Sequence, residues 1–368
     1  MASRIVLSVT NDMVIDQRVH RIASTLANAG NDVLVIGRYT GVWPDFSDRP
    51  YKVHLMRLWF KKGFLFYANY NVSLFFRLLR TKCTILTAND LDSLPANWMA
   101  AKLKRVALFF DSHEYFPEVP EVVNRKWVKR FWTFIEKTLV PRANYHYTVC
   151  QSIADLYKSK YNLDFKVVRN VPLLKDEENR EVEIERNENI IMYQGAINVG
   201  RGIENIIDAM PMIPDAKLVI AGGGPLENDI KKRIQESPAR ERIKYLGRLP
   251  FHQLHQYTIQ AQIGISIEEN LGLNYYYALP NKLFDYIQAG LAVVTSDFPE
   301  MKRVVDEYHI GTTIDNRSPE NLANTINPIL ADKKQLSAWQ NNARAAAVEL
   351  CWEKEQNILL SIYKAVNA

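Results

Sequence analysis

The chain has 368 residues, of which 47% are hydrophobic, so it is too long for one ordinary core and predicts two globular domains. Its three cysteines, Cys83, Cys150 and Cys351, are widely spaced and odd in number, which argues against a disulfide framework or a paired metal-ligand motif and favours a reducing compartment. No stretch reaches the roughly 18 apolar residues of a membrane span, and mixed charges interrupt the apolar core that a signal peptide would need near the N-terminus.

Alternating strand and helix patterns open the chain. Short apolar runs predict strands over 4–9, 32–38, 83–90, 107–114, 145–150 and 165–170. Helical spacing occurs between them, over 17–30, 93–104 and 125–140. This β-α-β order predicts a parallel sheet in a first domain over residues 1–173.

A charged, apolar-poor stretch at 174–189 interrupts the pattern and predicts a linker. The alternation then restarts and predicts a second parallel domain over 190–350. Its expected strands lie at 189–196, 216–224, 243–248, 262–267 and 292–297, and its expected helices at 203–210, 227–237 and 281–289. The amphipathic segment 351–368 is expected to pack back on the first domain. Two doubly wound domains of this kind would face a central cleft at the carboxyl ends of their strands.

Charge is uneven along the chain. Residues 1–180 hold 27 Lys and Arg against 17 Asp and Glu, whereas the remainder holds 19 against 24. The basic first half suggests an anionic partner, such as a phosphorylated ligand or an acidic bilayer, although solvated surface charge explains the asymmetry about as well.

Two glycine-rich loops and one helix start in the second half suggest a phosphate site. Gly195 and Gly202 in "GAINVGRG" let backbone amides approach a ligand, with Arg201 beside them, and Gly224 ends a second such loop. In "LPNKLFDY", Asn281, Lys282 and Asp285 occupy the start of a helix, where a phosphate and ribose could be bound. A flexible turn and a capped helix with an exposed ion pair are the structural alternatives. Neither glycine loop has the G-x-G-x-x-G spacing of dinucleotide folds.

These motifs, in this order, resemble the retaining glycosyltransferases of family four, which have the two-domain GT-B fold. The resemblance covers nearly the whole chain and includes "YQGAINVGRGIENIIDAM", "LVIAGGGPLE", "LPNKLFDYIQAGLAVV", "DQRVHRIASTLANAGNDVLVIGR" and "DSHEYF". It implies a nucleoside-diphosphate sugar as donor, with UDP or GDP as the nucleotide, and no required cofactor or metal.

Carried over to this chain, the resemblance places Arg201 and Lys282 on the donor diphosphate and Asp285 on the ribose. Asn281 and the glycines Gly195, Gly202 and Gly224 would assist. Glu268 or Glu269 would approach the sugar ring, and a position at the rim of the site is the alternative for both. The chain departs from the family pattern at Ala196, where an Arg is usual, so one phosphate cation is missing.

The acceptor side is expected in the first domain. His113 would face the transferred sugar, which makes it a predicted catalytic residue with Arg201 and Lys282; a structural histidine ending a core strand is about as common. Weaker acceptor candidates follow the first and third strands, where helix capping is the alternative: Asn11, Asp12, Asp16, Arg18, Asp90 and Asp92.

The resulting hypothesis is a retaining glycosyltransferase that moves a sugar to a saccharide or lipid-linked acceptor in surface polysaccharide or glycolipid assembly. A nucleotide-sugar 2-epimerase and a non-catalytic nucleotide-sugar-binding scaffold are the alternatives. We expect a cytoplasmic protein, at the inner face of the membrane if two basic-aromatic stretches, 61–80 and 125–137, contact anionic lipid. No nucleic-acid recognition motif accompanies the charge.

Overall fold

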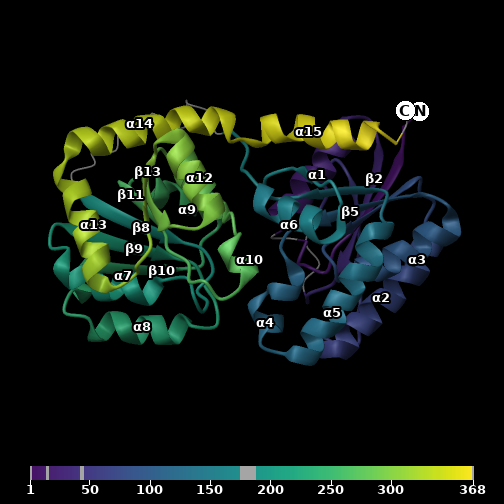
Figure 1. The fold of residues 1–368 in the computed structure, drawn as a ribbon, viewed down its shortest axis with the longest axis horizontal. Coiled ribbons are helices and arrows are strands. Elements are labelled where there is room, and N and C mark those ends of the chain that lie inside the picture. Colours follow the sequence, from purple (N-terminus) through teal and green to yellow (C-terminus); the bar gives the residue numbers. More distant parts are fainter. Residues whose placement is uncertain (1, 14–15, 42–44, 175–187, 367–368) are drawn as a thin grey trace. The chain divides into compact units, whose positions relative to one another are not determined.

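The computed structural model describes residues 2–13, 16–41, 45–174 and 188–366, and it divides into two compact units (Figure 1). The first unit contains residues 1–170 and 355–368, and the second contains residues 171–354. The predicted linker at 174–189 lies almost entirely outside the described residues.

A parallel seven-stranded sheet forms the centre of the first unit, in the order β3-β2-β1-β4-β5-β6-β7. Its strands are β1 (Arg4–Ser8), β2 (Asp32–Arg38), β3 (Lys52–Met56), β4 (Ile85–Asn89), β5 (Ala107–Ser112), β6 (Tyr145–Thr148) and β7 (Lys166–Val167). The strand order reverses between β1 and β4, and such a switch point is where open α/β sheets bind ligands.

Helices connect and cover these strands. They are α1 (Gln17–Asn28), α2 (Gly63–Arg80), α3 (Leu94–Lys104), α4 (Pro120–Val123), α5 (Lys126–Leu139) and α6 (Gln151–Tyr161). Part of α15 (Trp352–Lys364) also belongs to this unit, because Tyr363 stacks on Phe109 at 4.3 Å between ring centroids and its hydroxyl lies 2.8 Å from Thr87 Oγ1.

The second unit repeats this plan with a parallel six-stranded sheet in the order β10-β9-β8-β11-β12-β13. The strands are β8 (Asn189–Gln194), β9 (Ala216–Ala221), β10 (Ile243–Gly247), β11 (Ile263–Ser266), β12 (Ala292–Ser296) and β13 (Gly311–Ile314). The helices are α7 (Ile203–Ala209), α8 (Glu227–Glu236), α9 (Phe251–Thr258), α10 (Leu273–Tyr276), α11 (Asn281–Gln288), α12 (Pro299–Tyr308), α13 (Pro319–Ala331) and α14 (Lys333–Glu349).

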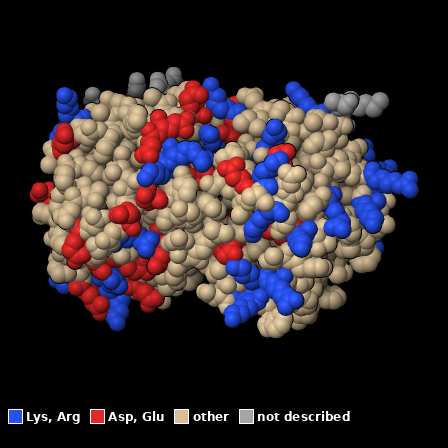
Figure 2. Space-filling view, viewed as in Figure 1, with Lys and Arg blue, Asp and Glu red and all other residues tan. Residues whose placement is uncertain are grey.

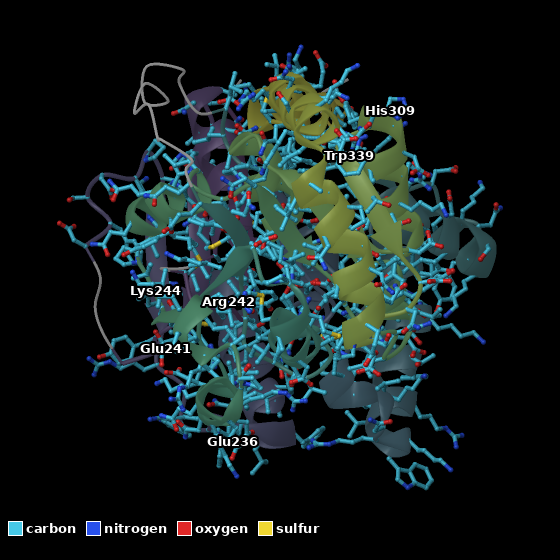
Figure 3. The ribbon with its side chains drawn as sticks, turned by 90° about the vertical axis from the view of Figure 1, so that its left-hand side faces the viewer. Glu236, Glu241, Arg242, Lys244, His309 and Trp339 are labelled. Atoms are coloured by element: carbon cyan, nitrogen blue, oxygen red, sulfur yellow. The ribbon has the colours of Figure 1, made fainter. Side chains whose placement is uncertain are left out.

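Two apolar cores lie on opposite faces of this second sheet. Ile191 of β8 belongs to the core shared with α7 and α13, whereas the next residue, Met192, belongs to the core shared with α11 and α14. Successive side chains of a strand point to opposite faces, so a continuous apolar run is what a sheet covered by helices on both sides requires. Trp339 of α14 packs against the first of these cores. Figure 3 shows Trp339 in the same view of the second unit as Glu236 at the end of α8.

The predicted fold class, two doubly wound parallel-sheet domains, is confirmed. The structure adds the edge strands β3 and β13, which the sequence interpretation did not identify. The capping alternative was wrong for Asp92, because no side chain caps α3. Ser93 is at the N-cap position, but its hydroxyl donates to the carbonyl of Asn89. Among the described residues, no helix is both long and apolar enough to cross a membrane.

Candidate functional site

The switch point of the second sheet is built from tightly packed glycine loops. Gly195 follows β8 with φ +135°, and a Cβ on Gly224 would lie 2.2 Å from the carbonyl oxygen of Ile197. A Cβ on Gly202 would lie 2.3 Å from the carbonyl oxygen of Ile267, in the loop after β11. Gly195 therefore requires glycine for its backbone conformation, and Gly202 and Gly224 require it for close backbone approach. Together they fix the loop that carries Arg201.

Helix α11 is held against the sheet by Tyr286. The tyrosine ring lies where a Cβ on Gly264 of β11 would be, and its hydroxyl accepts from the Gln194 amide at 3.0 Å and donates to the Ile265 carbonyl at 3.2 Å. This anchoring brings Lys282, the second residue of α11, to the carboxyl ends of β8 and β11.

A buried carboxylate gathers the two predicted phosphate cations. Glu268 is completely buried, and its Oε1 lies 2.7 Å from Lys282 Nζ and 3.5 Å from an Arg201 guanidinium nitrogen. The Ser266 hydroxyl donates to the other carboxylate oxygen at 3.0 Å. The Lys282 ion pair is close but is not aligned as a hydrogen bond, so electrostatic attraction provides the contact.

Aromatic rings support both cations. Lys282 Nζ lies 4.4 Å from the ring centroid of Tyr193, and the Arg201 guanidinium lies 4.7 Å from that of Tyr275. Cation–π contacts of this length stabilise a positive charge without neutralising it. The cluster of two cations and one carboxylate therefore keeps an excess positive charge.

The pKa values follow from burial and this pairing. Burial opposes ionisation of Glu268, but Lys282 and Arg201 outweigh it and lower the pKa of the carboxyl. Burial also lowers the pKa of Lys282, Arg201 adds to that effect, and Glu268 opposes it. Glu268 is thus the group that keeps a buried ammonium charged beside a guanidinium.

Asp285 and Asn281 occupy the same first turns of α11. Asp285 accepts from Gln194 Nε2 at 2.8 Å, and Gln194 Oε1 in turn accepts from the Thr258 hydroxyl at 2.7 Å. Asn281 is the exposed first residue of the helix. The predicted donor residues are therefore close together in the fold, and their roles toward a donor stay predictions.

At the switch point of the first sheet, a histidine lies between two carboxylates. His113 Nε2 is 2.9 Å from Asp111 Oδ2, and its Nδ1 is 3.3 Å from Asp90 Oδ2. Asp90 also accepts from the His113 backbone amide at 2.8 Å, and it has the left-handed φ of +62°. Burial opposes the charged imidazole, but the two carboxylates raise the pKa of His113 to about 9. Burial raises the pKa of Asp90 to about 8, against the opposing effect of His113.

Arg18 lies behind this histidine, where the sequence interpretation expected an acceptor contact. It is 2% exposed, its Nε and terminal nitrogen donate to Asp111 at 3.1 and 2.7 Å, and its other terminal nitrogen donates to the Val168 carbonyl at 2.8 Å. Arg18 is thus a structural group that orients Asp111, because its guanidinium is buried and its donors are bound within the protein. This corrects its assignment to the acceptor.

A cavity of about 430 Å³ brings some of the other candidates together. Asn11, Asp90, Asp92 and His113 line it, along with Thr10, Arg38, Phe66, Tyr67, Glu114, Phe116, Val119 and Val122. We call this the polar pocket. The Thr10 hydroxyl donates to Asp92 at 2.5 Å, and burial raises the pKa of Asp92 to about 7.

Asp12 and Asp16 are not among the side chains that line the polar pocket. Asp16 caps α1 by accepting from the Val19 amide at 3.0 Å and also accepts from Asn11 Nδ2 at 3.1 Å, so the capping interpretation holds for it. Asp12 accepts from the Thr40 hydroxyl at 3.0 Å.

Several residues of these clusters were not foreseen. Tyr193, Gln194 and Asp111 are the last residues of their strands or one position before the end, and a rule that selects polar or aromatic residues at strand ends would have found them. Tyr275 lies on the short inserted helix α10, and no spacing in the sequence identifies it. Among the described residues, no group of three or more His, Cys, Asp or Glu side chains is arranged to hold a metal ion.

Comparison with solved structures identifies the architecture. Sucrose-phosphate synthase from Thermosynechococcus elongatus superimposes with a TM-score of 0.79 at 18% identity, and the match covers 99% of each chain. The structure of HepE from Anabaena in complex with UDP and glucose superimposes with a TM-score of 0.78 at 14% identity and covers 100% of each chain. Two doubly wound units and these neighbours define a protein of the GT-B glycosyltransferase fold.

Two family models match successive parts of the chain. "Glycosyltransferase Family 4" matches residues 15–172 and "Glycosyl transferases group 1" matches residues 175–346. Together the two models cover nearly the whole chain, which therefore belongs to the glycosyltransferases of family four. An uncharacterized glycosyltransferase from Methanocaldococcus jannaschii is 24% identical over 191 residues, which are 50% of this chain and 47% of that protein. The chain therefore matches about half the length of this curated relative.

Proposed function

We propose that the protein is a retaining glycosyltransferase that uses a nucleoside-diphosphate sugar, with UDP or GDP as the nucleotide. The acceptor is a hydroxyl of a saccharide or a lipid-linked saccharide, in the assembly of a surface polysaccharide or glycolipid. The reaction takes place on the cytoplasmic side of the membrane. The observation that carries the proposal is the cluster in which Glu268 holds Lys282 and Arg201 side by side at the switch point.

The cluster matches the electrostatic demand of the reaction. As the bond between the anomeric carbon and the diphosphate breaks, negative charge grows on the leaving phosphate oxygens. Two cations already fixed by Glu268, Tyr193 and Tyr275 can stabilise that charge without reorganising at the moment of reaction. Metal independence is part of the proposal, because these side chains would do what a metal ion does in other sites.

The remaining parts of the donor have matching groups nearby. Asp285 is fixed by Gln194 and lies one turn after Lys282, where a ribose hydroxyl can donate to it. In a retaining reaction of this type the acceptor attacks from the face that the diphosphate leaves, and a departing phosphate oxygen takes the acceptor proton. No protein nucleophile is then needed. His113 would bind or orient a sugar hydroxyl from the polar pocket.

Calorimetric titration with UDP, GDP, ADP and CMP, with and without EDTA, tests the donor site. We expect one nucleoside diphosphate to bind equally well with the chelator present. Lys282→Ala and Arg201→Ala should each weaken that binding about 10- to 100-fold, since each removes a charge-assisted contact. Lys302→Ala is the matched control, because Lys302 is half exposed on the same unit and pairs with Asp297 at 2.7 Å.

Product analysis separates transfer from the two alternatives. A transferase consumes the nucleotide sugar only when an acceptor is present, an epimerase converts it without one, and a scaffold binds it without turnover. Failure of the folded protein to bind any of the four nucleotides would contradict the proposed donor site.

A further inference from the structure

Two cavities of the first unit share part of their walls. The polar pocket adjoins a second cavity of about 580 Å³, and Tyr67 and Val122 line both of them. The second cavity is lined chiefly by apolar side chains of α2 and α5, including Phe64, Ala68, Trp127, Val128, Phe131 and Ile135. We call it the apolar groove.

Aromatic contacts between α2 and α5 shape the groove. Phe64 meets Phe131 edge-on at 6.1 Å between ring centroids, and Tyr67 meets the buried Trp132 at 5.1 Å. Trp132 also contacts Phe116, a residue that lines the polar pocket. Because the two helices are already packed together in this way, the groove is formed without a ligand.

The groove leaves large apolar side chains in water. Phe64 is 70% exposed and Trp127 is 81% exposed, and Phe134, one turn after Phe131 on α5, is exposed as well. A single exposed aromatic residue needs no explanation, but a contiguous patch around a preformed groove indicates a binding surface. Apolar lining and a volume of several hundred Å³ are typical of sites that enclose a ligand.

Positive charge gathers at the start of α5, next to this apolar surface. Arg125 lines the groove, and α5 adds Lys126, Lys129 and Arg130 within its first turns. Of these, Lys129 pairs with Glu118. Figure 2 shows Lys and Arg side chains gathered over the part of the first unit where Figure 1 places α4 and α5. A hydrocarbon chain that carries a negative group is complementary to such a surface, whereas a neutral hydrocarbon chain would make no ionic contact with the basic side chains.

We propose that the acceptor is an anionic amphiphile whose hydrocarbon chain lies in the apolar groove and whose polar head enters the polar pocket. Tyr67 and Val122 form the border at which the chain meets the head. The basic residues at the start of α5 bind the anionic group. This inference rests on the proposed function, since it names the class of acceptor, and it commits to a lipid chain as the occupant of the groove.

Alkyl phosphates of increasing length test the proposal without any nucleotide. Octyl, decyl and dodecyl phosphate are titrated below their micelle-forming concentrations into the full chain, with inorganic phosphate as the chain-free probe. We expect affinity to rise about tenfold for every two added carbons, because each buried methylene adds a similar increment. Equal affinity for all three probes would overturn the proposal.

Matched variants locate the chain. Phe131→Ser and Phe64→Ser should each weaken dodecyl phosphate binding about tenfold. Phe76→Ser should leave it unchanged, because Phe76 is half exposed on the same helix α2 but does not line the groove. All three side chains are partly exposed, and circular dichroism confirms that each variant is folded. Equal weakening by the three variants would show general surface adhesion, as on a bilayer, and would contradict a chain in the groove.

Sedimentation tests the remaining occupant. If the unliganded protein is a dimer that Phe131→Ser disperses, and no alkyl phosphate binds, a second copy covers the groove and the proposal is wrong. The alkyl phosphate titration contains no nucleotide, so it tests the lipid chain in the apolar groove independently of the proposed donor site. Failure of the protein to bind UDP or GDP would contradict the proposed function. If a nucleotide binds but the affinity for alkyl phosphates does not depend on chain length, only this inference is contradicted.

Discussion

The two switch points contain buried ionic clusters of opposite design. In the second unit one carboxylate, Glu268, holds two cations, whereas in the first unit the carboxylates Asp90 and Asp111 hold one histidine. In the second-unit cluster, Arg201 remains partly exposed. In the first-unit cluster, Asp111 is completely buried and is bound to Arg18. One fold therefore carries a cluster with excess positive charge at one switch point and a histidine held between two acidic side chains at the other.

The largest expected effect tests the first-unit cluster. Asp111→Asn leaves the buried Arg18 without a counter-charge, and we expect the free energy of unfolding to fall by about 4 kcal/mol, as for other broken buried pairs. Chemical denaturation measures the loss. Asp32→Asn is the control, because Asp32 pairs with Arg4 and Lys52 at the surface and should change stability by less than about 1 kcal/mol. Similar losses in the two variants would mean that burial does not determine how much the ion pair of Arg18 and Asp111 contributes to the free energy of unfolding.

The next effect tests the second-unit cluster. Glu268→Gln leaves Lys282 and Arg201 side by side without their carboxylate, and we expect a loss of about 3 kcal/mol. A bound diphosphate would replace the missing negative charge, so UDP or GDP should raise the melting temperature of this variant by more than that of the unchanged chain.

Glu269→Gln is its sequence-adjacent control. Glu269 is half exposed and lies 3.7 Å from Arg317, so its loss should change neither stability nor the nucleotide shift. A nucleotide shift that is the same in Glu268→Gln and the unchanged chain would show that the diphosphate does not bind at the two cations.

The difference between the clusters also explains what the sequence could predict. Strand and helix periodicity predicted both sheets, because buried parallel strands are apolar runs and the covering helices have their own spacing. Lys282 and Arg201 could be named as donor-site candidates because each lies in a local motif, a helix start or a glycine loop. Glu268 was expected near the sugar ring or at the rim, and its pairing with Lys282 was not predicted, because only the folded chain brings it within 2.7 Å of Lys282, 14 positions along the sequence.

Arg18 shows where such prediction fails. It directly follows a polar strand-to-helix loop, as the second residue of α1, and was assigned to a ligand. Its partner Asp111 is 93 positions away and comes close only when β5 is in place. A motif records local geometry, whereas a buried ion pair depends on sheet topology. The apolar groove has the same origin, because α2 and α5 are distant in sequence and form it together.

A smaller effect tests how the glycine loops support the cations. Gly224→Ala would place a Cβ 2.2 Å from the Ile197 carbonyl oxygen, so the backbone must shift, at a cost of about 2 kcal/mol. Since the displaced loop leads to Arg201, nucleotide affinity should fall about tenfold. Gly247→Ala has positive φ but meets no atom within 4 Å, so it should cost about 1 kcal/mol and keep nucleotide affinity. Equal affinities in both variants would show that this loop packing does not position Arg201.

The smallest effect, taken per pH unit, is a pH dependence that tests the proton held in the first unit. The folded pKa values of Asp90 and His113, about 8 and about 9, both lie above the reference values of 3.8 and 6.5. The folded state therefore keeps protons that the unfolded state releases, so stability contributed by these groups is present at low pH and is lost as pH rises toward 9. Because Asp90 and His113 lie 3.3 Å apart, they hold this proton as a pair, and the slope should stay below about 1.4 kcal/mol per pH unit.

Denaturation of the unchanged chain and of Asp90→Asn between pH 6 and pH 9 measures this loss. The variant lacks the Asp90 proton, and His113 loses one of the two carboxylates that raise its pKa, so its stability should fall less steeply with pH. His309→Gln should keep the full slope, because His309 lies exposed on the second unit (Figure 3). If the Asp90→Asn curve runs parallel to that of the unchanged chain, the proton is not shared between Asp90 and His113, and the contrast drawn between the two clusters does not hold.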